Sequence, residues 1–433
     1  MRDVLPEEAR RWRYVEQLLR RVLLGNGYEE IRLPMLEATE LFSRGVGEAT
    51  DIVEKEMYSL ADRDGESVTL RPEGTAGCVR ALIQRGLLYN QTQRVFYAGD
   101  MFRYERPQKG RYRQFYQLGA EAFGLPGPDV DAELIYMGLE FWRALGIQDH
   151  ARLEINNLGS AAARANFKAA LVEYLTSRQD RLDEDSQRRL HSNPLRILDS
   201  KSASTQEVLA DAPSLPEFID ADSKAQFQGL RDALDALGLS YQVNPRLVRG
   251  LDYYTHTVFE WMTDSLGAQG TICAGGRYDG LVELLGGKAT PGIGFAMGLE
   301  RVLLLHEAVH GEAAAPAAEF AAAVEVYSCV LEPQYHSWAL NFAQKLRDGL
   351  PGIRIRTHAG GGKLKNQLKR ADQSGARVAL MIGADEVQAG AVTVKFLRGD
   401  EEQKTLPIEQ VSIELKEYFA IFDRGELGVR LSD

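Results

Sequence analysis

Residues 95–118 read VFYAGDMFRYERPQKGRYRQFYQL, and this stretch decides the fold of the chain. Its two ends, 95–99 and 113–118, are short runs that contain aromatic residues and predict strands. The segment between them is charged and contains Pro107 and Gly110. Two strands joined in this way form a hairpin with a long loop, so we predict an antiparallel sheet.

Around this hairpin the chain changes character. Residues 159–240 contain Ala- and Leu-rich stretches with interleaved charges, which predict amphipathic helices. Strand character returns at 241–243 and at 257–262, and a helix is expected over 299–309. We therefore expect a core over 1–318 that contains antiparallel sheet and is interrupted by a helical insertion.

A second unit is expected at the C-terminal end. Residues 312–318, EAAAPAA, are small and interrupted by proline, which is typical of a linker. Strand-like and helix-like segments then alternate from 324 to 382. This alternation predicts an α/β domain over 322–425 with a largely parallel sheet, and the class of the whole chain is then α+β.

Composition excludes several classes of protein. An apolar fraction of 44% and a charged fraction of 26% exclude a disordered chain, and the length of 433 residues suggests roughly three domains. No window approaches the roughly 20 apolar residues that span a bilayer, which excludes a membrane protein. The first residues, MRDVLPEE, are typical of a helix start and not of a signal peptide, so we expect a cytoplasmic protein. The formal net charge of -11, taken alone, argues against a nucleic-acid partner.

Standard metal and nucleotide motifs are absent or weak. The 3 cysteines lie far apart and predict neither a disulfide framework nor a cysteine zinc site. His306 and His310 have the His-Glu-x-x-His spacing that can hold zinc on a helix. Gly311 follows at once, however, so we favour solvated histidines at a helix end and expect no zinc. No standard phosphate-binding glycine loop occurs.

The loop of the hairpin concentrates positive charge in an acidic chain. Arginines that leave a strand beside aromatic residues are placed to bind phosphates or to stack on a base. A solvated basic turn is the alternative reading. The loop holds five basic residues opposed by Glu105, namely Arg103, Arg106, Lys109, Arg111 and Arg113.

Two further segments carry polar side chains where chemistry could occur. In 70–75, LRPEGT, Glu73 could bind an ammonium group, or it could cap the helix that begins at Thr75. In 249–255, RGLDYYT, Arg249 precedes two tyrosines, and a strand entry with a buried aromatic residue would also explain this pattern.

In this order the segments resemble the class II aminoacyl-tRNA synthetases. Leu33–Pro34, with the helix before it, is similar to the dimer-forming motif 1. Residues 102–107, FRYERP, are similar to motif 2, and residues 298–301, GLER, to motif 3. These motifs are short and indicate only the class.

Three longer signatures narrow the resemblance to the histidyl-tRNA synthetase family. They are residues 69–75, TLRPEGT, residues 249–255, RGLDYYT, and residues 274–281, AGGRYDGL. The resemblance runs nearly end to end. It implies an antiparallel-sheet catalytic core with a helical insertion over 159–240, followed by an α/β anticodon-binding domain.

The resemblance also implies an activity and partners. L-histidine and ATP, with Mg²⁺, would give histidyl-adenylate and pyrophosphate, and a homodimer would transfer histidine to the 3′ end of tRNA(His). A catalytically silent regulatory paralogue that acts in histidine biosynthesis is the alternative. The presence of a C-terminal domain and of Arg249, Tyr254 and Glu121 argues against that alternative.

The implied site divides into two parts. Arg103 and Arg249 would act in catalysis by holding the carboxylate and the α-phosphate, while Arg111 and Arg301 would bind the phosphates of ATP. Glu121 and Tyr254 would read the imidazole, with Tyr278 lining the same pocket. Glu73, Thr75 and Gln117 would bind the α-amino group. The implied histidine-binding residues are Glu73, Thr75, Gln117, Glu121, Arg249, Tyr253, Tyr254 and Tyr278.

A second basic cluster lies in the C-terminal domain beside three consecutive glycines. A solvated helix face explains any single lysine equally well, but the cluster suits contact with tRNA phosphates. Its members are Lys363, Lys365, Lys369 and Arg370.

Overall fold

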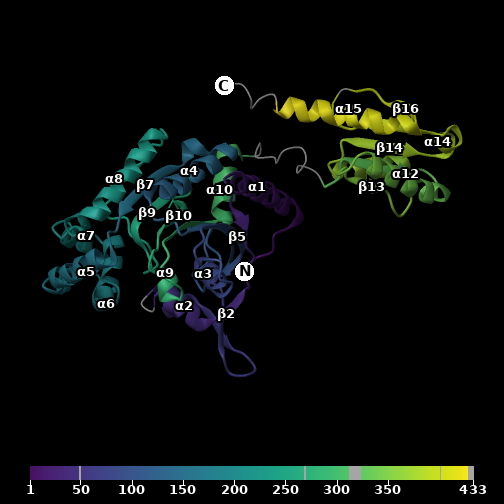
Figure 1. Ribbon diagram of the computed structural model, residues 1–433. Helices are drawn as coiled ribbons and strands as arrows, with labels where there is room; N and C mark the ends of the chain where they lie inside the picture. The colour runs from purple at the N-terminus through teal and green to yellow at the C-terminus, as the bar shows by residue number, and fades with distance from the viewer. Residues whose placement is uncertain (48–49, 268–269, 312–322, 400, 428–433) are drawn as a thin grey trace. The chain divides into compact units, whose positions relative to one another are not determined.

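The computed structural model describes residues 1–47, 50–267, 270–311, 323–399 and 401–427 (Figure 1). The chain divides into two units. One unit comprises Met1–Leu5 and Val15–Ala314, and the other comprises Pro6–Tyr14 and Ala315–Asp433. The expected linker 312–318 lies outside the described residues, as does the expected start of the second domain at 322, so those two limits stay predictions.

An eight-stranded sheet with the order β1-β5-β6-β11-β10-β9-β7-β8 organises the first unit. The predicted hairpin is confirmed, because β5 (Gln93–Phe102) and β6 (Gln114–Phe123) are antiparallel neighbours. The pairings at the two edges, β1 with β5 and β7 with β8, are parallel, and the pairings between β5 and β7 are antiparallel. The remaining strands are β1 (Glu29–Glu30), β7 (Arg152–Asn157), β8 (Gln242–Val243), β9 (Thr255–Met262), β10 (Thr271–Arg277) and β11 (Gly292–Gly298).

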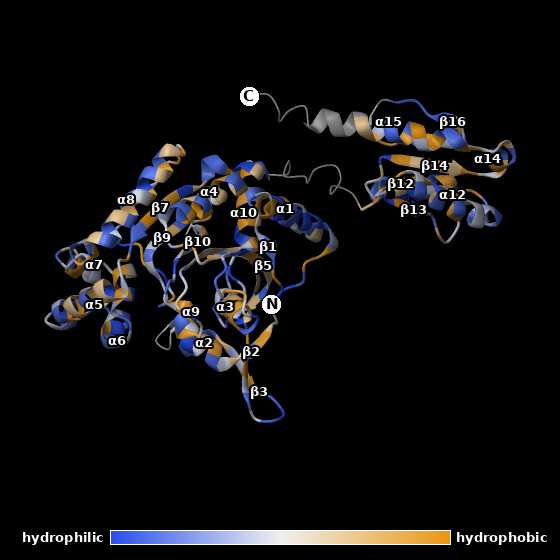
Figure 2. Ribbon diagram, viewed as in Figure 1, coloured by the Kyte–Doolittle hydropathy of each residue, from blue (hydrophilic) through white to orange (hydrophobic). Residues whose placement is uncertain are grey.

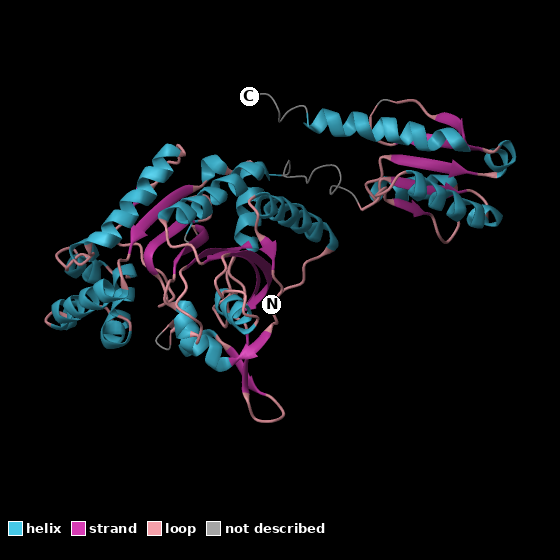
Figure 3. Ribbon diagram, viewed as in Figure 1, coloured by secondary structure: helices cyan, strands magenta, loops and turns pink. Residues whose placement is uncertain are grey.

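Helices pack on this curved sheet (Figure 3). Both α4 (Pro128–Ala144) and α10 (Leu299–His310) contact its central strands, and α1 (Pro6–Gly25) buries Val15, Leu19 and Leu23. Gly138 lets α4 approach closely, because a Cβ there would lie 2.2 Å from the indole nitrogen of Trp261. The close approach fixes the helix on the sheet that carries the site.

A small three-stranded sheet with the order β2-β4-β3 leads into another part of the site. Its strands are β2 (Leu36–Ala38), β3 (Tyr58–Ala61) and β4 (Ser67–Leu70). A turn joins β4 to α3 (Thr75–Gln84), and α2 (Thr39–Val46) packs beside α3. The turn therefore carries the LRPEGT segment between a strand and a helix.

The region between β7 and β8 is helical, as predicted, and lies to one side of the large sheet (Figure 1). Three of its helices begin at a side-chain cap, because Ser160, Asp183 and Asp220 each accept a hydrogen bond from a backbone N–H three residues further on. Its main helices are α5 (Ala161–Thr176), α6 (Glu184–Ser192), α7 (Ala203–Leu209) and α8 (Ala221–Ala236).

The second unit contains a five-stranded sheet with the order β13-β12-β14-β15-β16. The expectation of a largely parallel sheet is wrong for two of its four strand pairings, because β14 with β15 and β15 with β16 are antiparallel. The helix α14 (Ala384–Ala389) is too short for a crossover, and Gly390 at φ 61° turns the chain straight back. The strands are β12 (Val326–Val330), β13 (Ile355–Thr357), β14 (Val378–Ile382), β15 (Ala391–Phe396) and β16 (Lys404–Pro407), and the longer helices are α12 (His336–Gly349), α13 (Leu364–Gln373) and α15 (Ile408–Leu427).

Hydropathy follows these layers. The helices have apolar and polar sides, and β14 is apolar throughout (Figure 2). All five residues of β14 are buried, as expected for a central strand that is covered on both faces. Across the described residues, no helix combines the length and apolar character needed to cross a membrane.

Candidate active site

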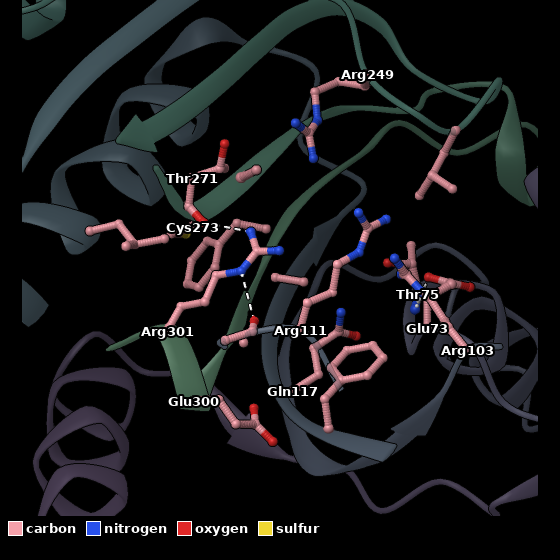
Figure 4. Close-up of a pocket in the computed structure, with 18 of the residues that line it drawn as sticks. Glu73, Thr75, Arg103, Arg111, Gln117, Arg249, Thr271, Cys273, Glu300 and Arg301 are labelled. Atoms are coloured by element: carbon pink, nitrogen blue, oxygen red, sulfur yellow. Dashed lines mark hydrogen bonds between the residues drawn. The ribbon is translucent and has the colours of Figure 1, made fainter. Parts of the chain in front are cut away.

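A cavity of about 190 Å³ opens in the first unit beside the hairpin loop (Figure 4). Its walls come from the hairpin, from β10 and β11, from the turn before α3 and from the start of α10. The structure thus brings together residues that are far apart in sequence. The predicted site residues that line the cavity are Glu73, Thr75, Arg103, Arg111, Gln117, Arg249, Tyr253, Tyr254 and Arg301.

Arg103 enters the cavity where β5 gives way to the loop. Its Nε donates to the carbonyl oxygen of Pro72 at 2.8 Å, and its guanidinium lies over the ring of Phe115 at 5.3 Å. Burial lowers the pKa of Arg103, although a guanidinium with this starting value stays charged. The hydrogen bond and the ring together fix a positive charge at one wall.

Arg249 comes from the segment before β9 and faces the cavity from another side (Figure 4). It forms an ion pair with Glu260, which also accepts a hydrogen bond from Thr271 Oγ1 at 2.9 Å. The Nε atom of Arg249 is buried and has no hydrogen-bond partner among the described residues. A buried donor without a partner is costly, so this atom is ready for a ligand oxygen.

Arg301 closes the third side. Its Nη1 donates to the carbonyl oxygen of Thr271 at 2.8 Å and its Nε to that of Gly110 at 3.2 Å, as the dashed lines in Figure 4 mark. Gly110 has a φ of 76°, which a residue with a side chain rarely adopts. The start of α10 and the tip of the hairpin loop are therefore joined through one guanidinium.

The basic residues of the loop have different positions. Arg111 lines the cavity and forms an ion pair with Glu105, whereas Arg106 and Lys109 are exposed and do not line it. Arg113 lies over the ring of Tyr104 at 3.9 Å. The positions of Arg103 and Arg111 thus fit the interpretation of the loop as a phosphate-binding site. Those of Arg106 and Lys109 fit the alternative of a solvated basic turn.

The position of Glu73 is compatible with both of its predicted roles, capping a helix and binding an ammonium group. Its carboxylate accepts the N–H groups of Thr75 at 2.7 Å and Ala76 at 2.8 Å, so it caps α3. It also lines the cavity, and burial raises its pKa. Gly74 is required here, because a Cβ would lie 2.1 Å from the ring of Tyr97.

Gln117 offers an acceptor to the cavity. The residue is 7% exposed, and its Oε1 is buried without a hydrogen-bond partner among the described residues. A buried carbonyl oxygen without a donor suits a ligand N–H or ammonium group.

Glu121 and Tyr278 are predicted site residues that the structure places beside the cavity wall and not in its lining. Glu121 accepts hydrogen bonds from Thr75 Oγ1 at 2.8 Å, from Tyr97 OH at 3.1 Å and from Tyr278 OH. Burial raises the pKa of Glu121 to about 8, against these donors, which lower it. Gly294, which does line the cavity, leaves space for this carboxylate, since its Cβ would lie 1.6 Å from Oε2.

Two side chains that contact predicted site residues were not themselves predicted, namely Tyr97 beside Glu121 and Glu260 beside Arg249. Tyr97 lies within a predicted strand, where a buried aromatic residue is ordinary and gives no signal. Glu260 did offer one, because it is a charged residue in the otherwise apolar run Val258–Trp261 of β9. A carboxylate in such a strand needs a partner, and here Arg249 supplies it.

The two histidines of the zinc-like motif lie on α10. Their ring centroids are 4.6 Å apart, and His310 Nε2 contacts the carbonyl oxygen of Leu145 at 2.9 Å. The helix ends at Gly311, as predicted. The expectation of solvated histidines is wrong for His306, which is 9% exposed because it lies on the buried side of α10 with Leu299 and Val302. Within the described ranges, no group of three or more His, Cys, Asp or Glu residues is placed to hold a metal ion.

The second unit carries the other predicted basic cluster on and next to α13. The four residues of this cluster are exposed, and the three glycines before it, 360–362, all have positive φ. A cavity of about 340 Å³ near these glycines is lined in part by His336 and His358. The cluster comprises Lys363, Lys365, Lys369 and Arg370.

Comparisons with known proteins agree with this arrangement. The sequence model of the family described as histidyl-tRNA synthetase matches residues 1–302, and that of an anticodon binding domain matches residues 326–418. The crystal structure of apo histidyl-tRNA synthetase from S. aureus is 35% identical, with a TM-score of 0.79, over 96% of this chain and 98% of that chain.

Two more distant structures share the fold. Histidyl-tRNA synthetase from Nostoc is 21% identical, with a TM-score of 0.69, over 97% of this chain and 98% of that chain. An ATP phosphoribosyltransferase regulatory subunit/histidyl-tRNA synthetase from Bacillus halodurans is 22% identical, with a TM-score of 0.62, over 89% of this chain and 97% of that chain. The extent of the family match and the identity to the S. aureus protein show that the chain belongs to the histidyl-tRNA synthetase family.

Proposed function

We propose that the chain is a histidine–tRNA ligase, which activates L-histidine with ATP and transfers it to tRNA(His). The observation that carries this proposal is the convergence of three guanidinium groups from separate elements, those of Arg103, Arg249 and Arg301, on one cavity. Family membership supports the ligase, and it leaves the catalytic activity itself to experiment.

The arginines suit the first step. The histidine carboxylate oxygen attacks the α-phosphorus of ATP, the new carboxyl–phosphate bond forms, and the bond to the β-phosphate oxygen breaks to release pyrophosphate. Such phosphoryl chemistry depends on positioning and on neutralising negative charge. Arg103 and Arg249 would hold the carboxylate and the α-phosphate, and Arg111 and Arg301 the outer phosphates.

The second step consumes the adenylate. A ribose hydroxyl at the 3′ end of the tRNA attacks the carbonyl carbon and loses its proton. The bond between that carbon and the phosphate-bound oxygen breaks, and AMP leaves with this oxygen and the electrons of the broken bond. The carboxylate of Glu73 and the amide of Gln117 would hold the α-amino group in both steps, with help from Thr75. The unpartnered Oε1 of Gln117 supports this assignment.

The imidazole of histidine would be read by the buried network. Tyr253 and Tyr254 line the cavity. Glu121 and Tyr278 lie behind its wall, where the carboxyl group of Glu121 accepts hydrogen bonds from Tyr278 and from the lining residue Thr75. Sites that pair a substrate N–H reject analogues that lack it by about 10⁴-fold or more, because polar groups of the site are then left unpaired. This accounts for selectivity without an editing domain.

Magnesium would enter as part of the ATP complex. Mg²⁺ takes oxygen ligands and uses one or two carboxylates together with substrate phosphates. Glu300 lines the cavity beside Arg301, and its carboxylate accepts the N–H of Tyr116 at 3.0 Å. Its oxygen donors fit the ion, and Mg²⁺ would supply further neutralisation of phosphate charge.

The remaining partners belong to the same proposal. The basic cluster of α13 would contact tRNA(His) phosphates. Apolar side chains near the proposed motif 1 are exposed in the single chain, including Met35 at 51% and Leu36 at 48%, which supports a homodimer. We place the enzyme in the cytoplasm, where its substrates are found.

The decisive test is ATP–pyrophosphate exchange measured with each of the twenty amino acids. We expect exchange with histidine alone, because the network around Glu121 recognises the imidazole. Absence of exchange with every amino acid, together with retained histidine binding, would instead indicate a silent regulatory paralogue. Exchange with another amino acid would refute the assigned specificity.

A further inference from the structure

The segment 247–254, between β8 and β9, carries three of the proposed histidine-binding residues, Arg249, Tyr253 and Tyr254. It forms neither helix nor strand. No ladder of backbone hydrogen bonds therefore fixes its shape, which depends on individual contacts.

Arg164 of the helical insertion contacts this segment at two carbonyl oxygens. It lies in the first turn of α5, and its two terminal nitrogens donate to the carbonyl oxygens of Asp252 and Tyr254. The two carbonyls flank Tyr253, so one planar guanidinium spans the part of the segment that faces the cavity. The rigid fork of arginine suits such a paired contact.

The core holds the same segment from elsewhere. The N–H of Asp252 donates to the carbonyl oxygen of Val46, at the end of α2, at 3.1 Å. Gly47 follows with a φ of 105°, and a Cβ there would lie 2.7 Å from the carboxylate of Asp252. Asp252 is thus in contact with the core and with the insertion at once.

The entry to the insertion is joined to β9, two residues after the segment ends. The N–H of His256 donates to the carbonyl oxygen of Gly159 at 2.8 Å, and that of Leu158 donates to the carbonyl oxygen of His256 at 2.7 Å. His256 has a φ of 49°, which is uncommon for a residue other than glycine. The insertion therefore contacts the segment through Arg164 and the start of β9 through Gly159.

We propose that Arg164 is a positioning residue through which the helical insertion sets the geometry of Arg249, Tyr253 and Tyr254. This inference rests on the proposed function and assigns to the insertion a role in histidine binding. The groups proposed for the outer phosphates, Arg111 and Arg301, lie on the hairpin and on α10 and do not contact Arg164. Loss of Arg164 therefore affects histidine more than ATP.

Arg164→Ala tests this separation. We expect the KM for histidine in exchange, and the Kd for histidine by calorimetry, to rise about tenfold, because two charge-assisted hydrogen bonds are lost. The KM for ATP should stay within about twofold. Arg164→Lys should raise the histidine constants by about threefold, since one ammonium cannot replace the planar fork.

Arg178→Ala is the matched control. Arg178 lies just after α5, and its side chain contacts its sequence neighbours Tyr174 and Ser177. Its Nη1 donates to the carbonyl oxygen of Tyr174 at 3.0 Å. Its removal takes a guanidinium from the insertion without touching the segment, so both histidine constants should equal those of the wild type.

Several outcomes would overturn the inference. An unchanged Kd for histidine in Arg164→Ala, or equal rises in both KM values with a lowered Tm, would leave Arg164 as an anchor of the insertion only. If Arg164→Ala does not fold, an unchanged histidine Kd in Arg164→Lys has the same meaning. If the wild type binds histidine but shows no exchange, the proposed ligase activity is contradicted and the positioning role of Arg164 is not. If the wild type binds no histidine, both proposals are contradicted.

Discussion

The arginines of the cavity and the basic residues of α13 carry the same charge in opposite surroundings. Arg103, Arg249 and Arg301 line a cavity, and each has a backbone or carboxylate partner that fixes its guanidinium. Lys365 and Lys369 are exposed on a helix. The first group is held in place before any ligand arrives, whereas the second can adjust to whatever phosphate is near.

This difference predicts different kinds of binding energy. A charge held in a water-poor site interacts strongly and at one geometry, so its loss affects the chemical step. An exposed lysine contributes a small attraction that salt screens and that adds to those of its neighbours. The net charge of -11 hides both groups, because an average says nothing about position.

Among these variants, Arg249→Ala should cause the largest loss of activity. We expect histidine-dependent exchange to fall by about 10³-fold in kcat, because the charge on the developing adenylate loses its neutralising partner. The KM for histidine should change less than kcat. Steady-state exchange at varied histidine and ATP measures both values.

The control for Arg249→Ala addresses Glu260. Removal of the arginine leaves this carboxylate, whose side chain is 12% exposed, without its ion-pair partner. The double variant Arg249→Ala, Glu260→Gln removes both charges, so a loss of exchange equal to that of the single variant assigns the effect to Arg249. Recovery of exchange in the double variant would show that the stranded carboxylate caused the loss.

Deletion of residues 321–433 should separate the contribution of the cavity to exchange from the contribution of α13 to tRNA charging. We expect exchange to stay within about twofold, because all the described residues that line the cavity belong to the first unit. Charging of tRNA(His) should fall by about 10²-fold, since the proposed phosphate contacts of α13 are lost. Charging that equals the full-length rate would contradict the anticodon-binding role of the second unit.

The sequence predicts the elements well and the contacts between them poorly. The hairpin of β5 and β6 follows from local patterns, and Glu73 lies on the turn that its Pro and Gly neighbours predict. The network of Tyr97 with Glu121 and the contact of Arg164 with segment 247–254 join residues that are distant in the chain. No local pattern carries such pairs. They depend on how β6, β9 and the insertion are placed by the fold.

The buried network beside the cavity should make the stability of the protein depend on pH. Burial raises the pKa of Glu121 to about 8 in the folded protein, above its ordinary value of 4.5. The folded state then binds the proton more tightly than the unfolded state. This contribution to stability is therefore full below about pH 4.5 and is lost as the pH rises from there to about 8. The expected slope is up to about 1.4 kcal/mol per pH unit.

Urea unfolding of the wild type and Glu121→Gln at several pH values between about 5 and 8 measures this slope. The variant has no proton to lose at this position, so the difference between the two free energies of unfolding should change with pH. Glu300, whose pKa is raised to about 7 by burial, is common to both proteins and cancels. Parallel curves would show that Glu121 is ionised over the whole range.

The smallest effect is expected from single lysines of α13. Lys365→Ala should weaken tRNA binding by about two- to threefold and reduce the slope of log affinity against log salt by about one, because one phosphate contact is lost. Lys345→Ala, an exposed lysine on α12, is the control and should change neither value. Filter binding across a salt series gives both. A loss above about 100-fold with an unchanged salt slope would show that Lys365 is fixed in one geometry like the arginines of the cavity, and the contrast between the two regions would fail at this residue.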